Sequence, residues 1–169
     1  MSNINTPLQD SIQYKSNIIS LICQSPKVVG LLVDDPNVDV DSDEVYEKVK
    51  NCIFDYDYVS KTVERSDAFI MVDADMISPS SGSINNWEIY IQVVCHKNYM
   101  ALDPKVFKGV KGNRRDNLMC EVDNLINGSR IAGIGKLTLF RATTSQVPDS
   151  FTSKLLTYGV PEFRRERLR

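Results

Sequence analysis

The feature that most constrains the fold is a pair of segments in which apolar residues recur at every second position. One runs from Asp67 to Ile77, and the other runs from Trp87 to about His96. A period of two is typical of strands, because successive side chains point to opposite faces of a sheet. The intervening SPSSGSIN is rich in serine, proline and glycine. We therefore expect a long antiparallel hairpin with a tip of about eight residues, longer than most hairpin loops.

Two helix signals precede this hairpin. Thr6-Pro7 and Ser25-Pro26 each combine a hydroxyl that caps backbone N–H groups with a proline that suits the first helical position. The second signal ends the first helix and begins a shorter one, which Asp35-Pro36 stops. The first helix carries apolar residues at helical spacing: Leu8, Ile12, Ile18, Ile19 and Ile22.

After the hairpin, the lysine-rich stretch from Tyr99 to Gly112 lacks a period and is expected to be a loop. A helix is predicted from near Asn113 to the stop signal Asn127-Gly128, because glycine tolerates the left-handed backbone found at helix ends. Two further strands follow, at 136–144 and 154–160. The helix is expected to bury Leu118, Val122, Leu125 and Ile126 and to expose Arg114, Arg115, Asp116, Glu121 and Asp123.

These elements predict an α+β fold in which a mainly antiparallel sheet of about four strands packs on two principal helices. At 169 residues the chain suits one domain, which we place at residues 1–161. An acidic loop at about 34–57 is inserted in it, with a short helix from about Asp43 to Lys50. The run CIFDYDYV reads as an ill-defined connector. Residues 162–169 are expected to be a flexible basic arm, since EFRRERLR has almost nothing to bury.

Charge is distributed unevenly, although the net charge is only −2. Nine acidic residues and two lysines lie between Asp34 and Asp57, whereas fourteen Lys and Arg and seven acidic residues lie between Lys97 and Arg169. Such asymmetry steers partners, or places a basic patch against a neighbour's acidic one in a ring of identical subunits. Two solvated regions without a partner remain the simpler interpretation. The candidate contact residues are Asp39, Asp41, Asp43, Arg164, Arg165, Arg167 and Arg169.

Motifs for phosphate and calcium binding fail at specific positions. The glycine cluster GSRIAGIGK has Arg130 where a P-loop needs glycine, and Leu137 where it needs serine or threonine. The alternating aspartates before Glu44 begin like an EF-hand, but Glu44 replaces its glycine and Lys50 its final glutamate. The sequence therefore predicts no cofactor and no metal site; a looser cation site at these aspartates is the minor alternative to a solvated acidic loop.

Histidine and cysteine chemistry is not expected either. The chain has one histidine, His96, and its neighbour Cys95 faces the other side of the predicted strand. The four cysteines (Cys23, Cys52, Cys95 and Cys120) are scattered, and we interpret them as reduced core residues. We expect no catalytic residues and no enzymatic activity.

Neither a membrane span nor an export signal is expected. The longest apolar runs fall short of the roughly 20 residues that a membrane helix needs. The start, MSNINTPLQD, lacks the basic and apolar regions of a secretory signal, which predicts a protein that acts where it is made.

Two parts of the chain resemble a known family. They are the hairpin, DAFIMVDADMI and NWEIYIQVVCHKNYM, and the run NRRDNLMCEVDNLINGSRIAGIGKLTLF, which together make up about a third of the sequence. In order of elements and polarity they resemble the tail-terminator and tail-completion (neck) proteins of tailed bacteriophages. The acidic insert and the arginine-rich end exceed the smallest members of that family.

The resemblance implies a non-enzymatic virion protein of the tail or neck, present in the host cytoplasm during assembly. It implies a homo-oligomeric ring, expected to be a hexamer, that terminates or joins the tail tube. Its partners would be the tail-tube protein on one side and a head-tail connector protein on the other. An alternative is a monomeric nucleic-acid adaptor that uses the basic C-terminal half, although a pI near 5.4 argues against nucleic acid. A small enzyme with an unrecognised site is a third possibility.

Overall fold

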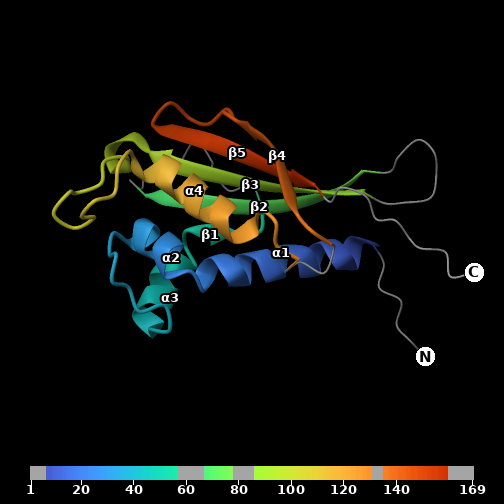
Figure 1. The fold of residues 1–169 in the computed structure, drawn as a ribbon, viewed down its shortest axis with the longest axis horizontal. Helices are drawn as coiled ribbons and strands as arrows, with labels where there is room; N and C mark the ends of the chain where they lie inside the picture. Colours follow the sequence, from blue (N-terminus) through green and yellow to red (C-terminus); the bar gives the residue numbers. More distant parts are fainter. Residues whose placement is uncertain (1–6, 57–66, 78–85, 131–134, 160–169) are drawn as a thin grey trace, which may run out of the picture.

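A five-stranded sheet with helices on one face forms the fold (Figure 1). The computed structural model describes residues 7–56, 67–77, 86–130 and 135–159. The predicted α+β class is confirmed. In chain order the elements are α1 (Pro7–Cys23), α2 (Pro26–Val33), α3 (Asp43–Val49), β1 (Ile53–Phe54), β2 (Ala68–Ile77), β3 (Asn86–His96), the 3-10 turn η1 (Lys97–Tyr99), α4 (Arg114–Ile126), β4 (Thr138–Thr143) and β5 (Phe151–Gly159).

The sheet has the order β1-β2-β3-β5-β4. The predicted hairpin is confirmed, with β2 and β3 paired antiparallel from Ala68 opposite Cys95 to Ile77 opposite Asn86. Its expected tip, 78–85, lies outside the described residues. Strands β5 and β4 continue the antiparallel pairing. The sequence predicted about four strands, one fewer than observed. The missed strand is the two-residue β1, which lies in the run interpreted as a connector and pairs parallel with β2.

Alternate residues of the central strands form the main core with the helices. From β2 and β3, Ile70, Val72, Ile89, Ile91 and Val93 are completely buried. They pack in one cluster with residues of α1, α2 and α4. The period of two therefore identified the inner face correctly. The helix residues buried against that face include Ile18, Ile22, Val28, Val29, Leu118, Val122 and Ile126.

A smaller cluster lies on the opposite face of the sheet. It consists of Phe69, Met71, Val94 and Phe151, with the aromatic rings of Phe69 and Phe151 6.1 Å apart. Among the described residues no helix covers this face (Figure 1). The sheet is thus buried on one side and only partly covered on the other.

The predicted helix boundaries are close to the observed ones. Ser25 accepts a hydrogen bond from the Val28 N–H at 3.4 Å, and Asn113 accepts one from the Asp116 N–H at 2.9 Å. Gly128, just after α4, has a φ of +83°, as its stop signal predicted. Strand β5 begins at Phe151, before the expected Lys154.

The prediction that all four cysteines lie in the core was partly wrong. Cys52 and Cys95 are buried, Cys23 is half-buried, and Cys120 is exposed on α4. Burial raises the pKa of the Cys95 thiol to about 11, so this thiol stays protonated at neutral pH.

No single helix in the described ranges is long and apolar enough to cross a membrane; α1 and α2 reach that threshold only as a pair, across a 76° bend.

Residue 30 must be glycine because the backbone of Asp35 lies close to it, and not because its own φ is positive. After α2 the chain reverses at Asp34, whose φ is +64°, and the Asp35 N–H donates to the Gly30 carbonyl at 3.0 Å. A Cβ atom on residue 30 would lie 2.6 Å from the Asp35 carbonyl oxygen. The fixed backbone of this turn leaves no room for a methyl group.

We predict that Gly30→Ala lowers the free energy of unfolding by about 1–3 kcal/mol, as overpacking does. Helix propensity alone would give the opposite sign, since alanine favours a helix interior by about 1 kcal/mol over glycine. Urea denaturation followed by circular dichroism measures the difference. Ile12→Ala, at a residue 66% exposed on α1, is the control and should change stability by less than about 0.5 kcal/mol. A stabilised Gly30→Ala protein would contradict the close approach.

Candidate interaction surface at the charged end

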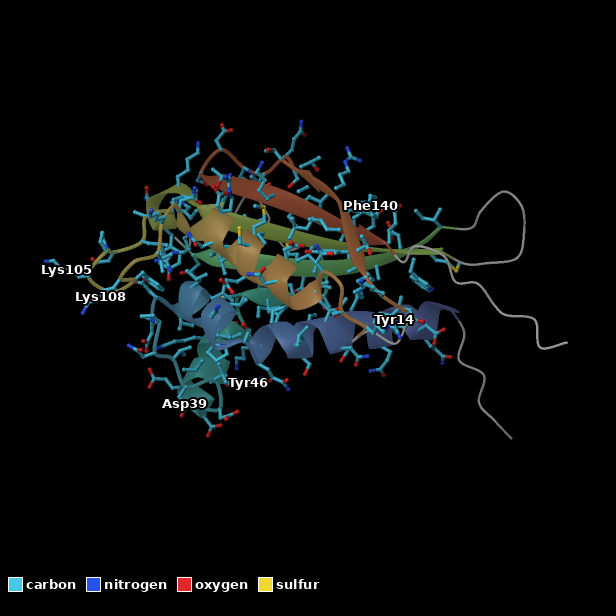
Figure 2. The ribbon with its side chains drawn as sticks, in the orientation of Figure 1. Tyr14, Asp39, Tyr46, Lys105, Lys108 and Phe140 are labelled. Carbon is cyan, nitrogen blue, oxygen red and sulfur yellow. The ribbon has the colours of Figure 1, made fainter. Side chains whose placement is uncertain are left out.

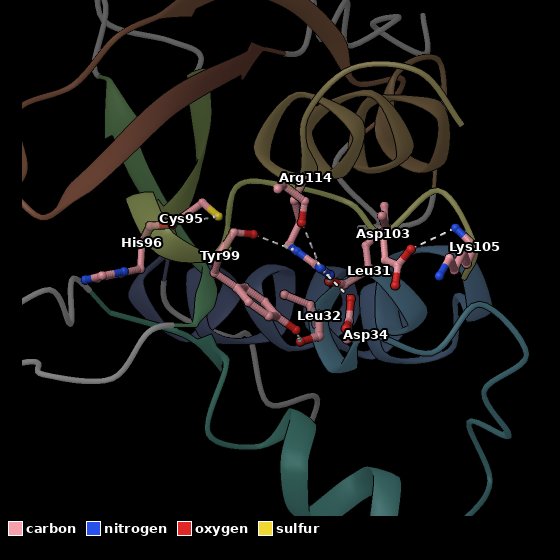
Figure 3. Close-up of polar contacts among 10 residues, drawn as sticks. Leu31, Leu32, Asp34, Cys95, His96, Tyr99, Asp103, Lys105 and Arg114 are labelled. Carbon is pink, nitrogen blue, oxygen red and sulfur yellow. Dashed lines mark hydrogen bonds and ion pairs between the residues drawn. The ribbon is translucent and has the colours of Figure 1, made fainter. Parts of the chain in front are cut away.

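Arg114 is a buried arginine that connects three segments at one end of the molecule (Figure 3). This residue, at the start of α4, is only 1% exposed. Nε donates to the Tyr99 carbonyl at 2.9 Å and Nη1 to the Leu31 carbonyl at 2.5 Å. Nη2 donates to the carboxylate of Asp34 and, at 3.5 Å, to the Ala101 carbonyl. The planar guanidinium, with donors on three nitrogens, suits such a set of acceptors.

Tyr99 completes this arrangement. The Arg114 guanidinium carbon lies 3.8 Å from the centre of the Tyr99 ring, a favourable cation–π geometry. The Tyr99 hydroxyl donates to the Leu32 carbonyl at 3.1 Å. Burial raises the pKa of Tyr99 to about 12, although Arg114 opposes the shift, so the hydroxyl remains a donor at neutral pH. The C-terminal end of α2 is therefore bound to the segment after β3.

The prediction that Arg114 is exposed was wrong. Arg114 lies four residues before Leu118 and eight before Val122, so helical spacing places it in line with the buried stripe of α4; its charge and its polar neighbours led to the prediction that it faces solvent. In the structure the first turn of α4 packs beside the end of α2, where backbone carbonyls need donors. Those acceptors come from residues distant in sequence, which is why the pattern did not reveal them.

The stretch 101–112 projects from this end as a basic loop, which we call the lysine loop (Figure 2). Phe107 anchors it: the side chain is buried, and its N–H donates to the Asp103 carbonyl at 2.8 Å. With Phe107 turned inward, the loop exposes lysines and valines to solvent. The exposed ones are Lys105, Val106, Lys108, Val110 and Lys111. The loop was predicted, but its inward phenylalanine and mixed outer surface were not.

The predicted acidic contacts lie on a neighbouring part of the same end. Asp39, Asp41 and Asp43 are all exposed, at the turn before α3 and at its first residue. The Asp41 N–H donates to the Asp39 carboxylate at 3.2 Å, which orders the turn. The short helix predicted from about Asp43 to Lys50 is confirmed as α3, and the segment also contains β1, which was not predicted. The predicted contact residues Arg164, Arg165, Arg167 and Arg169 lie outside the described residues.

A groove separates the lysine loop from α2 and the turn after it. Its inner part, of about 260 Å³, is lined mainly by Leu31, Pro36, Phe107 and Val110. Its outer part, of about 520 Å³, shares Pro36, Phe107 and Val110 and adds Asp35, Lys105 and Lys108. The floor is thus apolar and the rim is charged, with the lysines in excess over Asp35. At the inner end Lys27 and Glu121 form an ion pair with 3.6 Å between nitrogen and oxygen.

The uncovered sheet face is a second polar surface. It has a hollow of about 250 Å³ whose lining includes Asp73, Asp75 and Tyr90. The Tyr90 hydroxyl donates to Glu88 at 2.5 Å, and this hydrogen bond, with burial, raises the pKa of Tyr90 to about 12. Lys15 forms an ion pair with Asp73 at 3.4 Å. Asp73 and Tyr90 thus already have partners, Lys15 and Glu88, that lie outside the lining of the hollow.

Within the described part of the chain, no group of three or more His, Cys, Asp or Glu side chains could hold a metal ion. His96 accepts a hydrogen bond from the Asn98 N–H at 3.1 Å and packs edge-on against Phe151. Cys95 lies on the other face of β3, in the main core, as the sequence predicted. The two side chains therefore do not form a nucleophile–base pair.

A protein-family model, YomW, matches residues 16–160. The chain belongs to the YomW family. No curated protein matches its sequence significantly. Among solved structures, a chain of the virion of a native gene transfer agent (GTA) particle has a similar fold, with a TM-score of 0.50 and 11% sequence identity over 86% of this chain and 90% of that one. At that identity the likeness shows that this YomW-family chain shares the fold.

We predict that Arg114→Met lowers the free energy of unfolding by about 3–5 kcal/mol, because the Leu31 and Tyr99 carbonyls lose their donor and Asp34 loses its ion-pair partner. Arg114→Lys should recover only part of this, since an ammonium group lacks the planar fork. Chemical denaturation measures both. The control, Arg115→Met, changes a neighbour whose ion pair with Asp116 is half exposed, and should cost less than about 1 kcal/mol. Equal losses at the two positions would contradict the role of Arg114.

Proposed function

We propose that this chain is a non-enzymatic structural protein of a phage-type virion, which forms a ring at the head-tail junction and terminates or joins the tail tube. The observation that carries the proposal is the fold shared almost end to end with a chain of a gene transfer agent virion. The phage association of the YomW family supports it. The ring and its place in the neck or tail rest on the resemblance of the hairpin and of the α4–β4 segment to tail-terminator and neck proteins.

The surface chemistry supports a role in assembly. The groove beside the lysine loop has an apolar floor and a charged rim. Apolar floors with charged rims are typical of protein interfaces. We infer that the chain contacts copies of itself in a ring, taken as a hexamer, with a tail-tube protein on one side and a head-tail connector on the other.

The first test locates the protein in particles. Antibody against the chain, viewed by electron microscopy of virions from the producing phage, should label the head-tail junction. Particles made without the chain should contain unjoined heads and tails, or tails of irregular length. Absence of the protein from virions, or labelling over the capsid surface, would overturn the proposal. Salt-dependent binding of DNA by a monomer would favour the nucleic-acid adaptor instead.

A second proposal concerns the predicted contacts. We infer that Asp39, Asp41 and Asp43 of one subunit pair with the arginines of residues 162–169 of its neighbour, with residues 1–161 as the folded domain. Arginine binds carboxylates in a bidentate manner, and the three aspartates are exposed at one end of the molecule. Ion pairs between exposed groups are individually weak, so the effect depends on several acting together.

We predict that truncation after residue 161, or the triple change of these aspartates to asparagine, weakens self-association about tenfold while leaving the circular dichroism spectrum unchanged. Mass photometry over a dilution series measures the association. The matched control removes three carboxylates elsewhere, with Asp10→Asn, Asp75→Asn and Asp149→Asn, and should have little effect. An unchanged oligomer in both test variants would exclude the pairing.

A further inference from the structure

We propose that the groove beside the lysine loop binds Tyr46 from α3 of a second copy of this chain, with the acidic residues around Tyr46 paired to the lysines of the groove. The inference rests on the proposed self-assembly and specifies its contact. In this contact the basic partner of the acidic segment is the lysine loop, which the structure describes. The contact does not involve residues 162–169.

The groove has the character of a site for one apolar side chain. Its inner part, about 260 Å³, is smaller than the roughly 300–1,000 Å³ typical of small-molecule pockets. Phe107 forms a fixed wall, because it is buried and is held by the turn that begins at Asp103. Val106 and Val110 on the same loop are 38% and 44% exposed, so the loop presents apolar surface to solvent between its lysines. A partner should therefore be apolar at its centre.

The rim defines the charge of that partner. Lys105 and Lys108 line the outer part of the groove together with Asp35, and Lys111 follows on the same loop, so positive charge is in excess at the rim. Lysines alone would suit a nucleic-acid backbone, but phosphates gain nothing from the apolar floor between them. An aromatic residue flanked by carboxylates matches both features, because the ring fills the floor while the acids reach the rim.

The chain presents such a group on its own surface. Tyr46 is 64% exposed in the middle of α3, which also exposes Glu44 and Glu47. The helix is held from beneath by Val49, which is buried in the core, so the ring is presented on an ordered element. Tyrosine is enriched at the centres of interfaces, since it buries a large area with few rotatable bonds.

The acidic groups are available for exchange at little cost. Glu44 pairs with Lys48 at 2.8 Å, and Glu47 pairs with Lys50, both on the exposed surface of the same segment. The exposed Lys48 partner lowers the pKa of Glu44 through a hydrogen bond, so this carboxylate is charged at neutral pH. Exposed pairs of this kind contribute little and can be replaced by pairs across an interface.

A second copy is required because of where the two surfaces lie. Figure 2 places Lys105 and Lys108 at the tip of the lysine loop, whereas Tyr46 and Asp39 lie on a separate projection below α2. The two projections extend in different directions from one end of the molecule, so Tyr46 does not reach the groove of its own chain. A surface and its complement at different places on one subunit make a head-to-tail contact, which closes into a ring when the rotation permits.

Disulfide trapping tests the contact directly. The double variant Tyr46→Cys/Val106→Cys, in a Cys120→Ser background, is oxidised both as purified protein and in assembled particles. Non-reducing gels should show a ladder of covalent multimers that ends at the copy number of the ring. Neither single variant should give a ladder. The control pair Ile12→Cys/Val106→Cys, with an equally exposed cysteine on α1, should give no ladder either.

Charge exchange supplies a second measurement. Lys105→Glu/Lys108→Glu and, separately, Glu44→Lys/Glu47→Lys should each weaken association at least tenfold in mass photometry, and so should Tyr46→Ala. Combining the two charge changes in one chain should restore association to within about threefold of the original. Lys136→Glu/Arg141→Glu makes the same charge change at exposed positions next to and within β4 and should have no effect.

The outcomes separate this inference from the proposed function. One outcome would overturn the Tyr46 contact but not the proposed ring. In it, oligomers or ring-bearing particles still form, the Tyr46→Cys/Val106→Cys variant gives no ladder, and the charge exchange does not restore association. Absence of the chain from virions would overturn the proposed function. A variant that has lost its native circular dichroism spectrum is replaced by the milder Tyr46→Ser or Lys105→Gln/Lys108→Gln, for which the same weakening is expected.

Discussion

The contact set of Arg114 is the interaction on which the charged end depends. One guanidinium group joins the first turn of α4 to the last turn of α2 and to the backbone after β3, and Tyr99 covers it. Two of its acceptors are the carbonyls of Tyr99 and Leu31, which burial separates from water. A buried carbonyl without a donor is costly, so these segments are stable together only while the arginine is present. Removing one partner from a buried charged set destabilises a protein strongly, whereas the intact set stabilises it little more than apolar side chains of the same size would. Its main effect is to fix the relative positions of the segments that it joins.

The consequence is that two surfaces of opposite charge are held in fixed positions. The lysine loop starts where Ala101 accepts from Arg114, and the acidic segment starts at Asp34, which pairs with the same side chain. The lysine loop and the acidic segment both extend from the packed part of the fold formed by α2, α4 and the hairpin. Interfaces between subunits need complementary groups at defined positions, since ordering a mobile loop on binding reduces affinity. The sheet and helices thus act as a support, and the recognition chemistry lies on the segments that leave it.

Much of this fold could be predicted from residue patterns. The alternation in β2 and β3 identified the hairpin and its inner face, because a strand that packs one face must alternate. The capping residue Ser25 located the start of α2, since such a cap acts on backbone groups within three residues. The two-residue β1 was missed because such a short strand has no period and exists only through its pairing with β2. The groove was missed because its walls, from α2 and from residues 105–110, are distant in sequence.

By itself the sequence determined the elements, the α+β class, the inner face of the sheet and the separation of acidic from basic segments. These follow from local interactions and from periodicity, which act over a few residues. Only the tertiary structure decided that Arg114 is buried, that Cys120 is exposed, and that Phe107 turns inward so that the lysines and valines of its loop face solvent. The physical reason is the same in each case. Whether a side chain is buried depends on which distant segment packs beside it, and a carbonyl of α2 that needs a donor leaves no mark in the sequence around residue 114.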